Sequence, residues 1–263
     1  MSAPDPNENV NVSKTRRPRG RRVFWWVLAS FGALVVAGIV GLVIWSQVGV
    51  YQAEPQPLAA VKANPAVTFT DTDSAIIMAP AEGNAELGLV YIPGAKVEAA
   101  AYAFKMSGVV EEEGITVVIT KPWLNLAFFD LRPLSAFTEL APEVDAWAVG
   151  GHSLGGVRAC MLASDADALA LFGSYCAADL AHSELSVLSL SGSEDGLSTP
   201  EKVDDARSLL PQDATMYEIA GANHASFGDY GPQAGDGIAS ISDDDMRDEI
   251  TEWLTAFADE TVN

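Results

Sequence analysis

The N-terminal part of the chain differs from the rest in its pattern of apolar and polar residues. Residues 23–53 contain no charged side chain, and residues 23–44 are almost wholly apolar. Three tryptophans lie near the two ends of this run: Trp25, Trp26 and Trp45. A helix needs about 20 apolar residues to cross a bilayer, and tryptophan favours the membrane interfaces. The pattern therefore predicts one transmembrane helix over 23–46.

Basic residues come directly before this run. Residues 1–22 contain six Lys and Arg and two Asp and Glu, a bias typical of the cytoplasmic side of a membrane helix. We interpret 1–22 as a basic cytoplasmic tail and 23–46 as an uncleaved, single-pass signal anchor of a bacterial cell membrane, which leaves the rest of the chain extracytoplasmic. The alternative is a protein secreted after signal cleavage. A cleaved signal usually has an apolar region of about 7–15 residues, and Tyr51-Gln52-Ala53 offers a poor cleavage site because its first residue is bulky.

Beyond the anchor, residues 47–66 are typical of a short, semi-stiff linker because they contain Glu54-Pro55-Gln56-Pro57 and several alanines. Over 67–263, short apolar runs then alternate with longer amphipathic stretches. The runs predict strands over 75–78, 87–92, 115–120, 146–149, 168–172, 187–190 and 215–219. The stretches predict helices over 98–113, 154–163, 201–210 and 243–258. This alternation predicts an α/β domain whose mostly parallel sheet is covered on both faces, with functional groups at the carboxyl ends of the strands.

Charge narrows the choice of partners. The chain carries 15 Lys and Arg against 36 Asp and Glu, a net charge of −21, of which residues 1–22 contribute +4. We expect no nucleic-acid partner, because phosphate binding needs a basic patch. The acidic outer domain should repel anionic lipid and polyanionic substrates, which favours a neutral or cationic substrate.

One sequence motif predicts a nucleophile. Gly151-His152-Ser153-Leu154-Gly155-Gly156 follows the predicted strand 146–149 and opens a predicted helix. G-x-S-x-G in that context is a nucleophile elbow, whose tight turn forces the serine into a strained backbone. We predict Ser153 as the nucleophile. The Leu154 amide, at the helix N-terminus, is the predicted first donor to the developing oxyanion.

A serine nucleophile needs a base, and the chain has three histidines. His152 sits beside the nucleophile and cannot easily fold back onto its hydroxyl. His182 lies in a polar stretch typical of a solvated surface. His224 comes after the predicted strand 215–219, late in the chain, and we predict it as the base.

The base in turn needs a carboxylate that orients its ring. Ser191-Gly192-Ser193-Glu194-Asp195-Gly196 follows the predicted strand 187–190, and its spacing favours Asp195, with Glu194 as the alternative. A second oxyanion donor is expected after the strand 87–92. There we predict the Ala95 amide, because Gly94 permits an unusual backbone and Ala95 is small; the alternative is that Pro93-Gly94 is merely a turn.

Together these stretches resemble the α/β-hydrolase superfamily over about 67–260. They are also similar to compact bacterial hydrolases related to dienelactone hydrolase. The stretches are Tyr91–Ala95, Gly151–Gly156, Gly192–Gly196 and Asn223–Gly228. The order Ser153, Asp195, His224 is the one that family uses. The chain departs from dienelactone hydrolase, whose nucleophile is cysteine. The short segment between 172 and 187 leaves no room for a cap domain.

The resemblance implies a Ser-Asp-His hydrolase. With the predicted anchor, we expect a membrane-tethered serine hydrolase that cleaves a small carboxylic ester, lactone or thioester through an acyl-enzyme, without a cofactor or metal. An envelope acyltransferase with the same residues and a catalytically silent binding module are the alternatives. The acidic loop 226–241, with Asp229 and Asp236, is expected to be solvated rather than to bind calcium. Whether Cys160 and Cys176 form a disulfide stays open.

Overall fold

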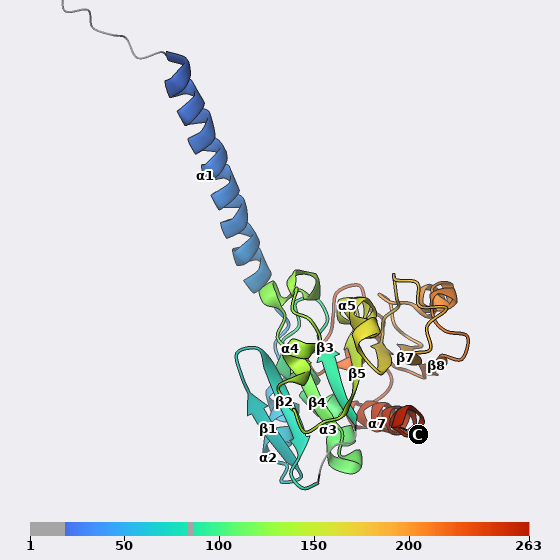
Figure 1. The fold of residues 1–263 in the computed structure, drawn as a ribbon. Helices are drawn as coiled ribbons and strands as arrows, with labels where there is room; N and C mark the ends of the chain where they lie inside the picture. Colours follow the sequence, from blue (N-terminus) through green and yellow to red (C-terminus); the bar gives the residue numbers. More distant parts are fainter. Residues whose placement is uncertain (1–18, 84–86, 263) are drawn as a thin grey trace, which may run out of the picture. The chain divides into compact units, whose positions relative to one another are not determined.

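The computed structural model describes residues 19–83 and 87–262 (Figure 1). The chain divides into two compact units, Met1–Trp45 and Ser46–Asn263. Helix α1 (Arg19–Gln47) is long and apolar enough, from Arg22 to Gln47, to cross a membrane. Most of the predicted basic tail, residues 1–18, lies outside the described residues, and the predicted domain boundaries stay predictions.

An eight-stranded sheet forms the centre of the second unit, in the order β1-β2-β4-β3-β5-β6-β7-β8. Its strands are β1 (Val67–Asp71), β2 (Ala75–Pro80), β3 (Leu87–Ile92), β4 (Thr116–Thr120), β5 (Ala146–His152), β6 (Ala168–Phe172), β7 (Ser186–Gly192) and β8 (Thr215–Ile219). From β4 to β8 all neighbours are parallel, whereas β2 runs antiparallel to both β1 and β4. The predicted mostly parallel α/β sheet is confirmed.

Helices cover both faces of the sheet, and each face has its own apolar core. Val61 of α2 (Pro55–Ala63), Met106 of α3 (Ala103–Glu113) and Ile250 of α7 (Asp243–Val262) belong to one core; α3 and α7 lie together in Figure 1. Phe137 of α4 (Ser135–Thr138) and Ala159 of α5 (Leu154–Leu162) belong to the other. The remaining helical segments are α6 (Pro200–Asp205), η1 (Ala99–Tyr102), η2 (Trp123–Asn125), η3 (Ala127–Phe129), η4 (Ala163–Asp165), η5 (Arg207–Leu209) and η6 (His224–Phe227).

The structure differs from the sequence analysis in the segment before the sheet. Residues 47–66, expected as a linker, contain helix α2, whose Val61 is buried in the core. Pro55 and Pro57 do not prevent this helix, because proline is tolerated in the first turn, where the backbone amides have no helical acceptor. Strand β1 was not predicted, because four of its five residues are at least partly exposed on an edge strand and its sequence is mostly polar.

The other elements agree closely with the predicted ones. The predicted helix 98–113 is divided into η1 and α3, and 201–210 into α6 and η5. Helix α3 ends before Gly114, which takes a left-handed φ of 69°. Strand β7 begins soon after β6 ends, with no cap domain between them, as expected.

Candidate active site

The nucleophile elbow has the predicted geometry. β5 ends at His152, α5 begins at Leu154, and Ser153 between them has φ 53° and ψ −122°. Such a backbone is sparsely populated for a residue with a Cβ, so the prediction of strain at Ser153 is confirmed. A Cβ on Gly155 would collide with the carbonyl oxygen of Ile92. Glycine therefore lets α5 approach the end of β3.

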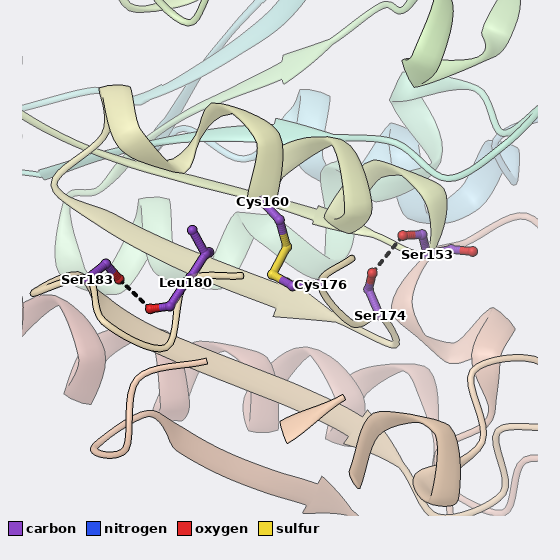
Figure 2. Close-up of a disulfide and its surroundings, with 6 residues drawn as sticks. All are labelled: Ser153, Cys160, Ser174, Cys176, Leu180 and Ser183. Carbon is purple, nitrogen blue, oxygen red and sulfur yellow. Dashed lines mark hydrogen bonds between the residues drawn. A yellow bond between two sulfur atoms is a disulfide. The ribbon is translucent and has the colours of Figure 1, made fainter. Parts of the chain in front are cut away.

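Neighbouring segments fix the strained residue from both sides (Figure 2). The Ser153 amide donates to the Phe172 carbonyl at 3.1 Å, and the Ser174 hydroxyl donates to the Ser153 carbonyl at 2.7 Å. Close by, Cys160 on α5 and Cys176 beyond β6 form a disulfide, which decides the open question of their pairing. Helix α5, which follows the predicted nucleophile Ser153, is thus covalently linked to the segment after β6.

His224 and Asp195 meet as a buried pair. His224 Nδ1 lies 2.8 Å from Asp195 Oδ2, and the two residues are only 1% and 3% exposed. Asp195 Oδ1 accepts hydrogen bonds from the amides of Leu197 (2.8 Å) and Ser198 (2.7 Å). The neighbouring Glu194 is exposed. Of the two predicted carboxylates, only Asp195 can orient the His224 ring.

A further carboxylate, that of Asp236, joins the loops that carry this pair. Asp236 Oδ1 accepts from the amides of His224 (3.0 Å) and Gly196 (3.1 Å), and Oδ2 accepts from Ala225 (2.8 Å). The Asp236 side chain therefore binds both Gly196, the residue after Asp195, and His224. Sequence analysis placed Asp236 in a solvated loop, and no local motif distinguishes it.

His152 lies against His224, the predicted base. Its ring lies 4.4 Å from that of His224, centroid to centroid. Burial, followed by the repulsion of His224, lowers the pKa of His152 well below its ordinary value, so the ring stays neutral. The Tyr102 hydroxyl accepts a hydrogen bond from the Gly94 amide at 2.9 Å and is hydrogen-bonded to His152 Nδ1 at 3.0 Å. Burial raises the pKa of Tyr102, which keeps the hydroxyl protonated.

The predicted oxyanion donors, the amides of Leu154 and Ala95, have no acceptor among the described residues. Gly94 differs from the expectation, because its φ is not positive; the left-handed residue of this loop is Lys96, at φ 57°. A Cβ on Gly94 would lie 2.9 Å from His152 Nδ1, so glycine provides space there. The Lys96 amide donates to the Asn125 carbonyl at 2.8 Å, which ties the Ala95 turn to the 123–129 segment.

Comparison with known proteins identifies the family. A sequence model of the alpha/beta hydrolase family matches residues 88–248, which include the elbow, Asp195 and His224. The chain belongs to the alpha/beta hydrolase family. The crystal structure of TT1662 from Thermus thermophilus is similar, with a TM-score of 0.54 and 12% sequence identity over 75% of this chain and 98% of that one. At this identity the likeness shows the fold alone. No curated protein matches the chain.

For this alpha/beta hydrolase, the acidic loop 226–241 differs from the solvated loop that was expected. Asp229 is buried and pairs with Lys105 Nζ at 2.7 Å; the same nitrogen contacts Asp243 at 2.7 Å. Burial raises the pKa of Asp229 to about 6, and Lys105 opposes that effect. A cavity of about 550 Å³ is lined by Asp229, Asp243 and Ile238 among others. Within the described ranges no group of three or more His, Cys, Asp or Glu could hold a metal ion.

The contact between the predicted nucleophile and the predicted base is not formed in this structure. Ser153 Oγ makes no hydrogen bond to His224 in the described structure, and such bonds often tighten only in the complex with substrate. His182, the third histidine, is exposed. Two of the predicted triad residues therefore touch, and the third follows His152, whose ring lies against His224.

Proposed function

We propose that the protein is a membrane-tethered serine hydrolase that cleaves a carboxylic ester, a lactone or a thioester. The observation that carries the proposal is the buried His224–Asp195 pair beside a serine held at positive φ. In this mechanism Asp195 accepts a hydrogen bond from the protonated Nδ1 of His224, which leaves Nε2 free to accept a proton. A neutral His152 does not compete for that proton.

The reaction follows from these groups. Ser153 Oγ attacks the substrate carbonyl carbon while its proton passes to His224 Nε2. The carbonyl oxygen becomes an oxyanion, which the amides of Leu154 and Ala95 stabilise. When the intermediate collapses, the leaving oxygen or sulfur takes the proton from His224 and the acyl group stays on Ser153. Water, deprotonated by His224, then attacks the acyl-enzyme and releases the acid, which restores Ser153.

The tether is helix α1. Its apolar stretch has the length of a membrane span, and the residues before it are basic. On the proposed topology the N-terminus is cytoplasmic and the catalytic unit is extracytoplasmic. The Cys160–Cys176 disulfide supports that side of the membrane, because disulfides persist in oxidising compartments.

Turnover of a short-chain p-nitrophenyl ester by the full chain in detergent tests the proposal. Ser153→Ala should lose several orders of magnitude in kcat, because the nucleophile is removed. Ser183→Ala is the matched control; Ser183 is exposed, lies in the 173–185 segment and should leave kcat unchanged. Hydrolysis by Ser153→Ala at the rate of the unsubstituted protein would exclude Ser153 as the nucleophile.

A further inference from the structure

The first residues of the second unit, Ser46 to Tyr51, are hydrogen-bonded to loops near the predicted active site. The Ser46 carbonyl accepts from Asn125 Nδ2 at 3.2 Å, and Ser46 is fully buried. The backbone amide of Tyr51 donates to the Lys96 carbonyl at 2.7 Å, and the Tyr51 carbonyl accepts from the Glu98 amide at 2.9 Å. The second unit therefore begins, at Ser46, beside the 122–131 loop and the Ala95 turn.

The loop that holds Ser46 exposes large apolar side chains. Asn125 lies within the 122–131 loop. Four large side chains of this loop are exposed to water: Trp123 (52%), Phe128 (46%), Phe129 (43%) and Leu131 (76%). Soluble surfaces seldom gather so many large apolar side chains in one short segment, and such a patch marks an interaction site. We call these four residues the apolar loop patch.

Basic side chains surround the same loop, although residues 47–263 are strongly acidic. Arg132 Nη2 donates to the Lys121 carbonyl at 2.9 Å, Arg158 Nη2 donates to the Arg132 carbonyl at 3.3 Å, and the Lys96 amide bonds to Asn125. These are four of the nine basic residues after position 46. Lys121 forms an ion pair with Asp71, and Arg132 forms one with Asp130.

We propose that the apolar loop patch rests in the interface of the lipid bilayer that α1 crosses. Ser46 follows Trp45 directly, and adjacent Cα atoms lie about 3.8 Å apart, so the loop that binds Ser46 cannot leave the depth at which the apolar run ends. Tryptophan and phenylalanine favour that depth, and the basic side chains suit lipid headgroups. The inference rests on the proposed membrane anchor and is independent of the hydrolase chemistry.

The consequence concerns access to Ser153. The Asn125 carbonyl binds Lys96, the residue after the predicted oxyanion donor Ala95. A loop seated in the headgroup region would hold the catalytic serine next to lipid, where an ester dissolved in the bilayer reaches it without crossing bulk water.

Fluorescent labelling in membranes tests the contact. The two native cysteines form a disulfide, so a new thiol can be labelled selectively. Full-length Phe128→Cys carries an environment-sensitive fluorophore in vesicles of phosphatidylcholine and phosphatidylglycerol. Glu143→Cys is the matched control, because Glu143 is exposed and precedes the amino end of β5, whereas the 122–131 loop follows the carboxyl end of the parallel strand β4. We expect blue-shifted emission and several-fold stronger quenching by spin-labelled lipid at position 128 than at position 143.

Three results would overturn the inference. Labels at 128 and 143 that respond equally place the loop in water. A protected label that lipid-borne quenchers do not reach, and whose protection falls as protein is diluted with lipid, assigns the patch to a second copy of the chain. A chain that fails to float with the vesicles has no anchor. None of these readings uses activity, so failure of the esterase assay leaves them intact.

Discussion

At the residue scale, the choice between two adjacent carboxylates is made by the turn that follows β7. The turn buries Asp195 against His224 and leaves the Glu194 side chain in solvent. Two backbone amides already satisfy Asp195 Oδ1, so Oδ2 is left for His224. A carboxylate fixed in this way holds the ring in one tautomer and stabilises its charged form.

Replacement of each carboxylate by its amide should separate them. Asp195→Asn keeps the size of the side chain but removes its charge, and we expect kcat to fall by about three to four orders of magnitude. Glu194→Gln should leave kcat within about two-fold, because the side chain is exposed. Steady-state kinetics on a p-nitrophenyl ester measures kcat for both variants. A large loss in Glu194→Gln with a small one in Asp195→Asn would reverse the assignment.

We predict that the Tyr102 hydroxyl positions the turn at Ala95, the predicted oxyanion donor. Tyr102→Phe removes the acceptor of the Gly94 amide and the hydrogen bond to His152 Nδ1, so the Ala95 amide should lose its alignment. We expect kcat to fall about ten-fold, the value of one hydrogen bond of about 1.4 kcal/mol, with little change in KM. Tyr217→Phe, which stacks on Trp253 away from the turn, is the control. An unchanged kcat in Tyr102→Phe would exclude the positioning role.

Sequence alone could propose Ser153, Asp195 and His224, because each follows a predicted strand within a short motif. Tyr102 and Asp236 could not be predicted in the same way. Each acts through hydrogen bonds to backbone or side chains that are distant in sequence, and neither belongs to a local pattern. Only the packed tertiary structure brings these partners together.

At the element scale, buried strands and their following turns were the most predictable parts. β5 and α5 have apolar runs and glycines that allow few other structures. Helix α2 was not predicted within the segment 47–66, because prolines and alanines are compatible with both a linker and the first turn of a helix. The structure of this segment depends on the packing of Val61 in the core and on the backbone hydrogen bonds of Tyr51 to residues distant in sequence.

The disulfide should stabilise helix α5, which follows the predicted nucleophile Ser153. It links residues 16 apart in sequence, and a loop of that size is worth about 3 kcal/mol of unfolding free energy. We expect the double variant Cys160→Ala with Cys176→Ala to unfold at a lower temperature than the unsubstituted protein. Thermal denaturation with and without reductant measures this effect. A melting temperature equal to that of the oxidised parent protein, or a reductant-sensitive double variant, would contradict it.

At the scale of the whole molecule, positive and negative charges are concentrated in different parts of the chain. The chain has a net charge of −21, yet its first 22 residues carry a net charge of +4, and four of the nine basic residues after position 46 lie near the 122–131 loop, two of them paired with Asp71 and Asp130. The remaining surface is acidic and should repel anionic substrates at long range.

Salt should therefore change selectivity. At about 10 mM ionic strength the Debye length is about 30 Å, and near 150 mM it is about 8 Å. We expect kcat/KM for an anionic ester to rise several-fold over this range, whereas that for a neutral ester of the same acyl chain changes little. Parallel assays of the two esters in detergent give the ratio of kcat/KM for the anionic ester to kcat/KM for the neutral ester at each ionic strength. A ratio that is independent of salt, or falls with it, would show that surface charge does not govern substrate choice.

The central claim is that Ser153 is a nucleophile activated by His224. Reaction of the full-length protein with a fluorophosphonate probe, followed by peptide mass analysis, tests it most directly, because the probe needs no knowledge of the substrate. We predict one modified serine, Ser153, with labelling abolished in Ser153→Ala and strongly slowed in His224→Ala. An unlabelled parent protein, or labelling that persists in Ser153→Ala, would contradict the account.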